Sequence, residues 1–182
     1  MDRTAILRYN GPQPNRGESV RVEPTQTLDK VSIAEQAGRL TEPFTMMDLA
    51  QIDDLTLSIF LCQGTMPFHR HVDQDELFLV HSGTISLESD WGTAVLRPGE
   101  MVVVPKGVGH RSSSLLRSYV LLFQPRLMIN RRNGYRRLFA IKGSGRLEKL
   151  NVPAMGRQVQ GLFQPVPLMQ LDAFVLNLIL CQ

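Results

Sequence analysis

Two short stretches decide the fold and the chemistry, GTMPFHRHVDQDELFLVHSG at residues 64–83 and GEMVVVPKGVGH at residues 99–110. In the first stretch, His69 and His71 are two positions apart, so a β-strand would direct both imidazoles to the same face. Glu76 follows five positions after His71 and begins the apolar run ELFLV. The stretch therefore combines two imidazoles and a carboxylate at the start of a predicted strand.

The second stretch supplies a third imidazole. A strand is predicted over residues 100–104, Pro105 and Gly107 turn the chain, and a histidine follows three positions later. Three neutral imidazoles and one carboxylate suit a divalent ion such as Fe, Mn, Ni or Zn, and would leave two octahedral positions open for water, O₂ or a substrate. The lack of thiolates argues against a structural zinc site. The sequence predicts one divalent metal ion held by His69, His71, Glu76 and His110.

Short apolar runs surround both stretches between residues 44 and 125, and Gly, Pro or Asp separates most of them. Regularly spaced short strands with such punctuation predict a β-sandwich or barrel. The sequence DWG at residues 90–92 is typical of a hairpin turn. One short helix is expected at residues 32–38, with Ser32 as its N-cap and Glu35 three positions further on.

The two stretches resemble the paired motifs of the cupin superfamily, G-x5-H-x-H-x3-4-E-x6-G and G-x5-P-x-G-x2-H-x3-N. The residues that match the first motif in spacing are His69, His71, Glu76 and Gly83. Those that match the second motif are Gly99, Pro105, Gly107 and His110. Two departures are Gly64, which stands one residue too close to the histidines, and Ser114, which replaces a non-ligating Asn. The resemblance covers roughly residues 28–125 and is nearest to the small phosphomannose-isomerase-like cupins.

This resemblance implies an all-β fold, the cupin double-stranded β-helix or jelly roll, with short helical segments at its N-terminal boundary. It also implies a small-molecule ligand and a homodimer that pairs through sheet edges and arms. Strand alternation places Phe78 and Val80 on the face of Glu76, where they would line the pocket. Met101 and Phe123 are further pocket candidates, with core packing as the alternative for each.

Three functions remain open at this level, because the same fold hosts several chemistries. The first is an Fe(II)-type dioxygenase acting on a small organic substrate, since no acid or base stands out beyond the ligand set. The second is a non-catalytic module that binds a metal or a small ligand. The third is an isomerase or lyase that uses Mn, Ni or Zn as a Lewis acid.

Composition indicates the size of the domain, the expected cellular location and the role of the cysteines. The chain has 182 residues with 43% hydrophobic and 20% charged residues, which is enough for one packed domain. It contains no apolar run of membrane-spanning length and no secretory signal, so we expect a cytoplasmic protein without a membrane partner. Cys62 and Cys181 are too few for a disulfide framework and are not spaced as a metal motif.

Basic residues gather in the C-terminal third. Residues 126–149 contain eight Lys or Arg and one acid. Such a segment could be an anion-binding strip, but no nucleic-acid-binding motif accompanies it. A solvated linker or a salt-bridged subunit contact is therefore favoured, and nucleic acid is not expected as a partner.

The chain also repeats itself at an offset of 119 residues. Ten of the 36 ungapped positions in residues 28–63 are identical to their counterparts, including the LxQxD pattern that begins at Leu49 and at Leu168. We therefore expect an N-terminal arm at residues 1–27, a metal-binding cupin domain at 28–126 and a basic linker at 127–146. Residues 147–182 would open a second, incomplete cupin unit, as in a truncated two-unit protein. Its apolar strand, residues 174–180, should pair with the edge of its own barrel or with a partner subunit.

Overall fold

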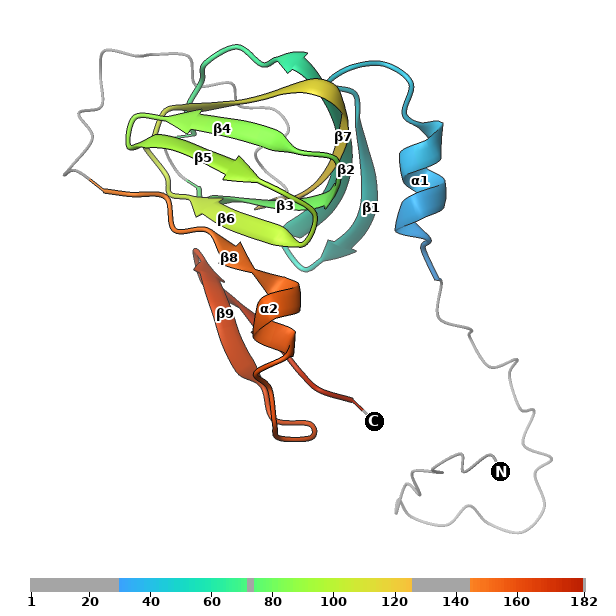
Figure 1. Cartoon of the computed structure of the whole chain (residues 1–182), viewed down its shortest axis with the longest axis vertical. Helices are drawn as coiled ribbons and strands as arrows, with labels where there is room; N and C mark the ends of the chain where they lie inside the picture. Colours follow the sequence, from blue (N-terminus) through green and yellow to red (C-terminus); the bar gives the residue numbers. More distant parts are fainter. Residues whose placement is uncertain (1–29, 72–73, 126–144, 182) are drawn as a thin grey trace, which may run out of the picture. The chain divides into compact units, whose positions relative to one another are not determined.

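A computed structural model describes residues 30–71, 74–125 and 145–181 (Figure 1). All of its helices and strands lie in one compact unit, Val31–Gln182. They are α1 (Ile33–Arg39), β1 (Met46–Ile52), β2 (Leu55–Thr65), β3 (Glu76–Ser82), β4 (Ile85–Ser89), β5 (Gly92–Leu96), β6 (Glu100–Val104), β7 (His110–Pro125), β8 (Leu150–Asn151), α2 (Val152–Gly156), β9 (Val166–Leu171) and β10 (Phe174–Leu178). The expected predominance of strands over helices is confirmed.

Eight strands form a single antiparallel sheet that folds over on itself (Figure 1). Its main order is β1-β2-β7-β3-β6-β8, and β4 and β5 join it through a pairing of β4 with β7. The 16-residue strand β7 makes this possible, because its first part pairs with β4 and its later part with β3, while β2 follows it on the other side. This arrangement is the double-stranded β-helix, or jelly roll, that the sequence predicted.

The barrel interior is filled by alternate side chains of the long apolar runs. On β3, Phe78 and Val80 point inward and face Val102, Val120 and Leu122 of the neighbouring strands. The odd-numbered side chains of the same strands point outward. Because many of them are apolar, other elements must pack against them to shield them from water. Helix α1 supplies part of this cover through Ala37, which packs with Leu40 on the outer face of β2.

Local signals in the sequence place these elements as expected. Ser32 caps α1, and its hydroxyl accepts a hydrogen bond from the Glu35 N–H at 3.4 Å. The β4–β5 hairpin turns at Asp90 and Trp91, and Gly92 follows with a φ of +107°, a conformation that favours glycine. Both predictions are confirmed.

The C-terminal hairpin, which we define as β9 and β10, covers another part of the outer face. Leu171 is buried together with Leu55, Leu77 and Met101 of the barrel. The apolar strand β10 pairs with β9 in a separate two-stranded sheet and not with an edge of its own barrel, while the alternative of pairing with a partner subunit stays a prediction. The pairing differs because β9, itself apolar, precedes β10 by a two-residue turn and offers the nearest antiparallel partner.

Several backbone features recur at the offset of 119 residues. Asn151 caps α2 as Ser32 caps α1, with its side chain accepting a hydrogen bond from the backbone N–H three positions on. Phe44 and Phe163 both have positive φ, at 59° and 56°. The hairpins β1–β2 and β9–β10 have the same register next to their turns, and each contains one irregularity at the equivalent position.

The expected N-terminal arm at residues 1–27 lies outside the described residues, as does the basic linker at 127–146 except for its last two residues. In the part of the chain that the structure describes, no helix has the length and apolar character needed to cross a membrane.

Candidate metal centre

Two strands and an isolated β-bridge bring the four predicted ligands together. Glu76 is the first residue of β3 and His110 the first of β7, while His69 forms an isolated antiparallel bridge with His110. Two backbone hydrogen bonds, of 2.9 and 2.7 Å, join His69 and His110 in both directions. One ligand atom from each of the four side chains lies within 4.8 Å of the other three. The cluster formed by His69, His71, Glu76 and His110 could therefore hold a metal ion.

Hydrogen bonds to carbonyl groups fix the orientation of two of the imidazoles. The Nδ1 atom of His69 lies 2.9 Å from the carbonyl oxygen of Pro67, and Nδ1 of His110 lies 3.2 Å from that of Val108. A carbonyl oxygen only accepts, so the proton of each neutral ring is on Nδ1. Each ring then presents the lone pair of Nε2 to the centre of the cluster, which is the arrangement of metal-binding histidines.

The centre of the cluster is buried, and the atoms that surround it are imidazole nitrogens and a carboxylate oxygen, which can bind a cation. The side chain of Glu76 is 5% exposed and that of His110 is 1% exposed. Nε2 of His110 lies 2.9 Å from Oε2 of Glu76, so a lone pair faces a carboxylate oxygen unless a proton or a metal ion lies between them. Nε2 of His71 lies 3.5 Å from the same oxygen and has no hydrogen-bond partner among the described residues.

The cluster also sets the charge of its carboxylate. Burial by itself raises the pKa of Glu76, but in the absence of an ion a proton on Nε2 of His110, together with the nearby His71, outweighs burial and lowers the pKa to about 2. Burial and the nearby His110 lower the pKa of His69. An ionised carboxylate beside a neutral imidazole is the protonation state in which both groups bind a metal.

The dimensions of the cluster fit an ion. Two ligand atoms at about 2.1 Å from a shared ion are about 3.0 Å apart when adjacent and about 4.2 Å apart when opposite. The greatest separation of 4.8 Å would thus require only a small contraction. The side chains of His69 and His71 are partly exposed, although Nε2 of His71 itself is buried.

A carboxylate that the sequence did not single out ties two ligand-bearing segments together. Oδ2 of Asp90 accepts the N–H of Gly109 at 2.6 Å and is 3.2 Å from the guanidinium of Arg70. Gly109 precedes His110, and Arg70 lies between the other two histidines. In the sequence, Asp90 was recognisable only as a turn residue, because a contact over 19 or 20 positions leaves no local pattern.

The predicted pocket residues divide between the two faces of the sheet. Phe78 and Val80 lie in the barrel interior, and the ring of Phe78 is 5.7 Å from that of His110. Met101 pairs with Leu79 and Phe123 pairs with Leu77, so both belong to the opposite face. They pack in the apolar clusters on the outer face, which agrees with core packing, the alternative role given for both residues.

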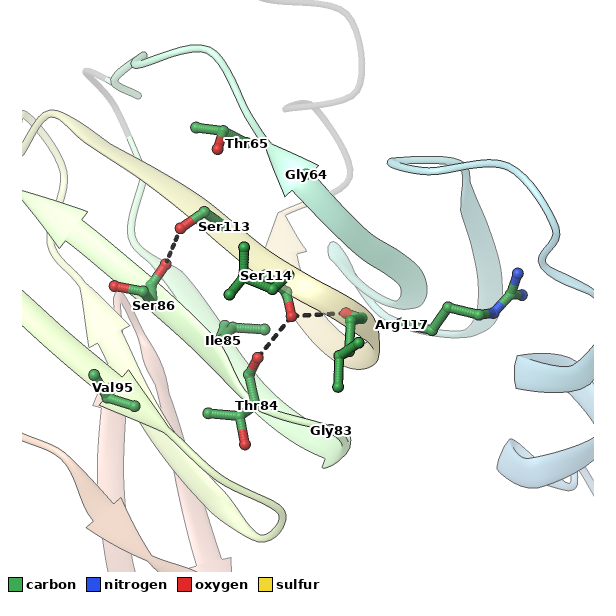
Figure 2. Close-up of a pocket in the computed structure, with 12 residues that line it drawn as sticks. Gly64, Thr65, Gly83, Thr84, Ile85, Ser86, Val95, Ser113, Ser114 and Arg117 are labelled. Atoms are coloured by element: carbon green, nitrogen blue, oxygen red, sulfur yellow. Dashed lines mark hydrogen bonds between the residues drawn. The ribbon is translucent and has the colours of Figure 1, made fainter.

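A separate hollow of about 500 Å³ lies where β7 bends (Figure 2). None of the four cluster residues lines it. The Ser114 hydroxyl lies 2.8 Å from the carbonyl oxygen of Thr84 and 2.7 Å from that of Leu116, to one of which it donates. At this position, where Asn is usual in the cupin motif, Ser114 thus connects the bend of β7 to the turn before β4.

Residues 59–114, which include all four cluster residues, match the cupin domain family. The uncharacterized protein YdbB of Bacillus subtilis (strain 168) is 30% identical over 83 residues, which are 45% of this chain and 74% of YdbB. The structure of a cupin-2 domain containing protein from Shewanella frigidimarina NCIMB 400 is similar with a TM-score of 0.51 and 25% identity, covering 53% of this chain and 94% of that one. A more distant similar structure is hydroquinone 1,2-dioxygenase from Sphingomonas sp. TTNP3, with a TM-score of 0.44 and 19% identity over 50% of this chain and 70% of that one.

Proposed function

The chain belongs to the cupin family, and from that premise we propose that it is a metal-binding cupin that acts as an Fe(II)-type dioxygenase on a small organic substrate. One divalent ion per chain would be held by the histidine and glutamate cluster described above. The ion could be Fe, Mn, Ni or Zn, because affinity follows the general order of the divalent metals and loading follows their availability.

The observation that carries the proposal is the convergence of four potential metal-binding groups on one buried point. Nε2 of His110 faces Oε2 of Glu76 at 2.9 Å, and Nε2 of His71 is buried without a hydrogen bond among the described residues. Burying such groups together is unfavourable unless a cation compensates them. A divalent ion satisfies all of them at once, whereas a single proton satisfies one pair.

The donor set favours redox chemistry over acid–base chemistry. Ferrous ion bound by histidines and one carboxylate, with part of its coordination sphere open, supplies the reaction with O₂ that non-haem oxygenases use. The chain itself would contribute an apolar interior, with Phe78 beside His110, that excludes water from one side. A small substrate would approach from the side of His69 and His71, the two ligands whose side chains are partly exposed.

Metal content tests the first part of this proposal. The purified chain should contain about one divalent ion, measured by plasma emission, and His71→Ala should contain almost none while keeping its β-sheet circular dichroism. His81→Ala is the matched control, since His81 is also a half-buried histidine but lies outside the cluster. Equal metal content in the two variants would reject the proposed ligand set.

Oxygen uptake tests the second part. The iron-loaded chain should consume O₂ in the presence of a member of a catechol and diketone panel, and the His71→Ala variant should not. Stoichiometric metal without any O₂ consumption would instead favour a non-catalytic binding module. Turnover of a substrate with Mn, Ni or Zn and without O₂ would favour a metal-dependent isomerase or lyase.

The homodimer remains a prediction that accompanies this function. Cupins resembling this chain pair through sheet edges and arms, and β1 provides such an edge because, among the described strands, it pairs only with β2. We expect light scattering at micromolar concentration to give twice the chain mass of 20.5 kDa. A mass of one chain would contradict the prediction.

A further inference from the structure

The turn of the C-terminal hairpin meets the loops that carry the metal ligands. Asp172 lies in this turn, between β9 and β10, and has a φ of 48°. Its Oδ2 accepts the N–H of Asp75 at 2.9 Å, and Oδ2 of Asp75 accepts the N–H of Asp172 at 3.0 Å. Two residues that are 97 positions apart thus hold one another by a reciprocal pair of hydrogen bonds.

Lys106 closes this arrangement on the other side. Its backbone N–H donates to Oδ1 of Asp75 at 2.9 Å, and its Nζ donates to Oδ1 of Asp172 at 3.1 Å. The ammonium group offsets the repulsion between the two carboxylates, and charge-assisted hydrogen bonds are stronger than neutral ones. We refer to Asp75, Lys106 and Asp172 as the latch.

The latch is directly attached to three of the proposed ligands. Asp75 immediately precedes Glu76 in the sequence. Gly107, which follows Lys106, donates its N–H to the carbonyl oxygen of His71 at 2.6 Å. The same loop leads into His110 three residues later. A shift of the latch would therefore move the backbone of ligands on both sides of the cluster.

Apolar packing keeps the hairpin in place independently of the latch. Leu171, adjacent to Asp172, is 3% exposed and packs with Leu77 and Met101. Leu77 is adjacent to Glu76. The latch therefore lies at the edge of an apolar contact, and its removal should leave the hairpin docked while releasing the two ligand loops.

From these contacts we infer that Asp172 is a positioning residue of the metal centre, through which the C-terminal hairpin holds the ligand loops in their binding geometry. The inference rests on the proposed function, because it requires that the cluster binds an ion. Partners of metal ligands typically contribute about 10- to 100-fold to metal affinity. Since such coupling is reciprocal, the ion should in turn protect the hairpin.

The first hairpin of the barrel provides a matched control. Asp53 occupies the equivalent turn between β1 and β2, with a φ of 50°. In both turns a glutamine side chain donates to the backbone oxygen of the aspartate, Gln51 at 3.3 Å and Gln170 at 3.0 Å. Glycine suits both positions because their φ is positive. Asp172→Gly and Asp53→Gly therefore alter the same kind of turn, but only the first removes the latch.

The test compares metal affinity in the wild-type chain and in three single variants. Competition with a chelator should give an affinity for Mn²⁺ or Fe²⁺ at least tenfold weaker in Asp172→Gly than in the wild type, and within twofold of the wild type in Asp53→Gly. Asp172→Asn, which retains one acceptor oxygen but loses the ion pair with Lys106, should fall between them. Circular dichroism of the metal-free chains verifies that each variant is folded.

Hydrogen exchange gives a readout that does not depend on the ion. In the metal-free Asp172→Gly chain, the amides of Asp75 and Gly107 should exchange faster than in the Asp53→Gly chain. Equal metal affinity of Asp172→Gly and the wild type would overturn the positioning role, whatever the exchange rates. A wild-type chain that binds no ion would overturn the proposed function, and the comparison of variants in metal-free exchange would still reveal whether the latch holds the ligand loops.

Discussion

Gly83, in the turn between β3 and β4, combines a backbone requirement with a steric one. Its φ is +83°, and a Cβ atom added there would lie 2.7 Å from Cα of the fully buried Ser118. Gly83→Ala should therefore lower the free energy of unfolding by about 3 kcal/mol, from left-handed strain and overpacking together. Urea unfolding monitored by fluorescence measures this loss.

Gly92→Ala separates the two contributions. Gly92 also has a positive φ, of +107°, but an added Cβ would meet nothing within 4 Å. This variant should lose only about 1 kcal/mol, the strain alone. Equal losses in the two variants would show that the contact with Ser118 yields at little cost.

The two cysteines should differ sharply in reactivity. Cys62 is fully buried, and burial raises the pKa of its thiol to about 11 despite a hydrogen bond with Ser112. Cys181 is exposed. Because the thiolate is the reacting form, one thiol per folded chain should react with a disulfide reagent at pH 8, and two should react after denaturation. Cys181→Ser should abolish the fast reaction, and two fast thiols in the folded wild type would contradict the structure.

At the scale of elements, an ion pair connects β6 to the segment that leads into β8. Nζ of Lys149 lies 3.0 Å from both carboxylate oxygens of Glu100, and the N–H of Arg97 donates to Oε2 at 2.8 Å. Burial raises the pKa of Glu100, but Lys149 and the Arg97 N–H outweigh it, so the pKa lies below its ordinary value. The folded chain thus binds this proton less tightly than the unfolded chain does.

The pH dependence follows from that sign. The stabilisation by Glu100 is complete above the ordinary pKa of about 4.3 and disappears as the pH falls through the lower folded pKa. Glu100→Gln should lower the free energy of unfolding by about 1 kcal/mol at pH 7, and the difference should vanish in acid. Glu88→Gln is the control, since Glu88 pairs with Arg111 at the surface and should change stability little. A difference that stayed constant as the pH fell below the ordinary pKa would contradict the assignment.

The sequence predicted those elements whose signals are local. Ser32 and Glu35 predicted the start of α1. The two-residue period of extended chain predicted that His69 and His71 share a face and that Phe78 lies inside the barrel. Met101 shows where this reasoning failed, because apolarity alone does not say which face of a strand is the interior. The contact between Asp75 and Asp172 could not be predicted for another reason: it joins residues 97 positions apart, and no local pattern links the two.

The repeat could be predicted in part from the sequence. Its sequence identities indicated a second unit, and the structure has similar helix caps at Ser32 and Asn151 and similar turn conformations at Asp53 and Asp172. The docking of the C-terminal hairpin on the outer face could not be deduced, because an apolar strand specifies burial without specifying against what. A duplicated origin of this hairpin stays a prediction.

At the scale of the whole molecule, the cluster joins parts of the chain that are distant in sequence. His69 precedes β3, Glu76 begins β3 and His110 begins β7, so one ion would connect the two halves of the barrel. The unfolded chain cannot present these four groups together, and an ion that binds only the folded state stabilises it in proportion to its saturation. Metal removal should therefore lower global stability and not only local order.

Thermal unfolding with and without the ion measures this linkage. At a free metal concentration of 100 times the dissociation constant, the gain is about 2.7 kcal/mol, which corresponds to a Tm increase of roughly 5–10 °C for a chain of this size. Treatment with EDTA should reverse the increase, and His71→Ala should show no increase at any metal concentration. The His81→Ala chain should respond like the wild type, because only binding to the cluster couples the ion to folding. An equal increase in the His71→Ala chain would mean that the ion stabilises the protein from some other site.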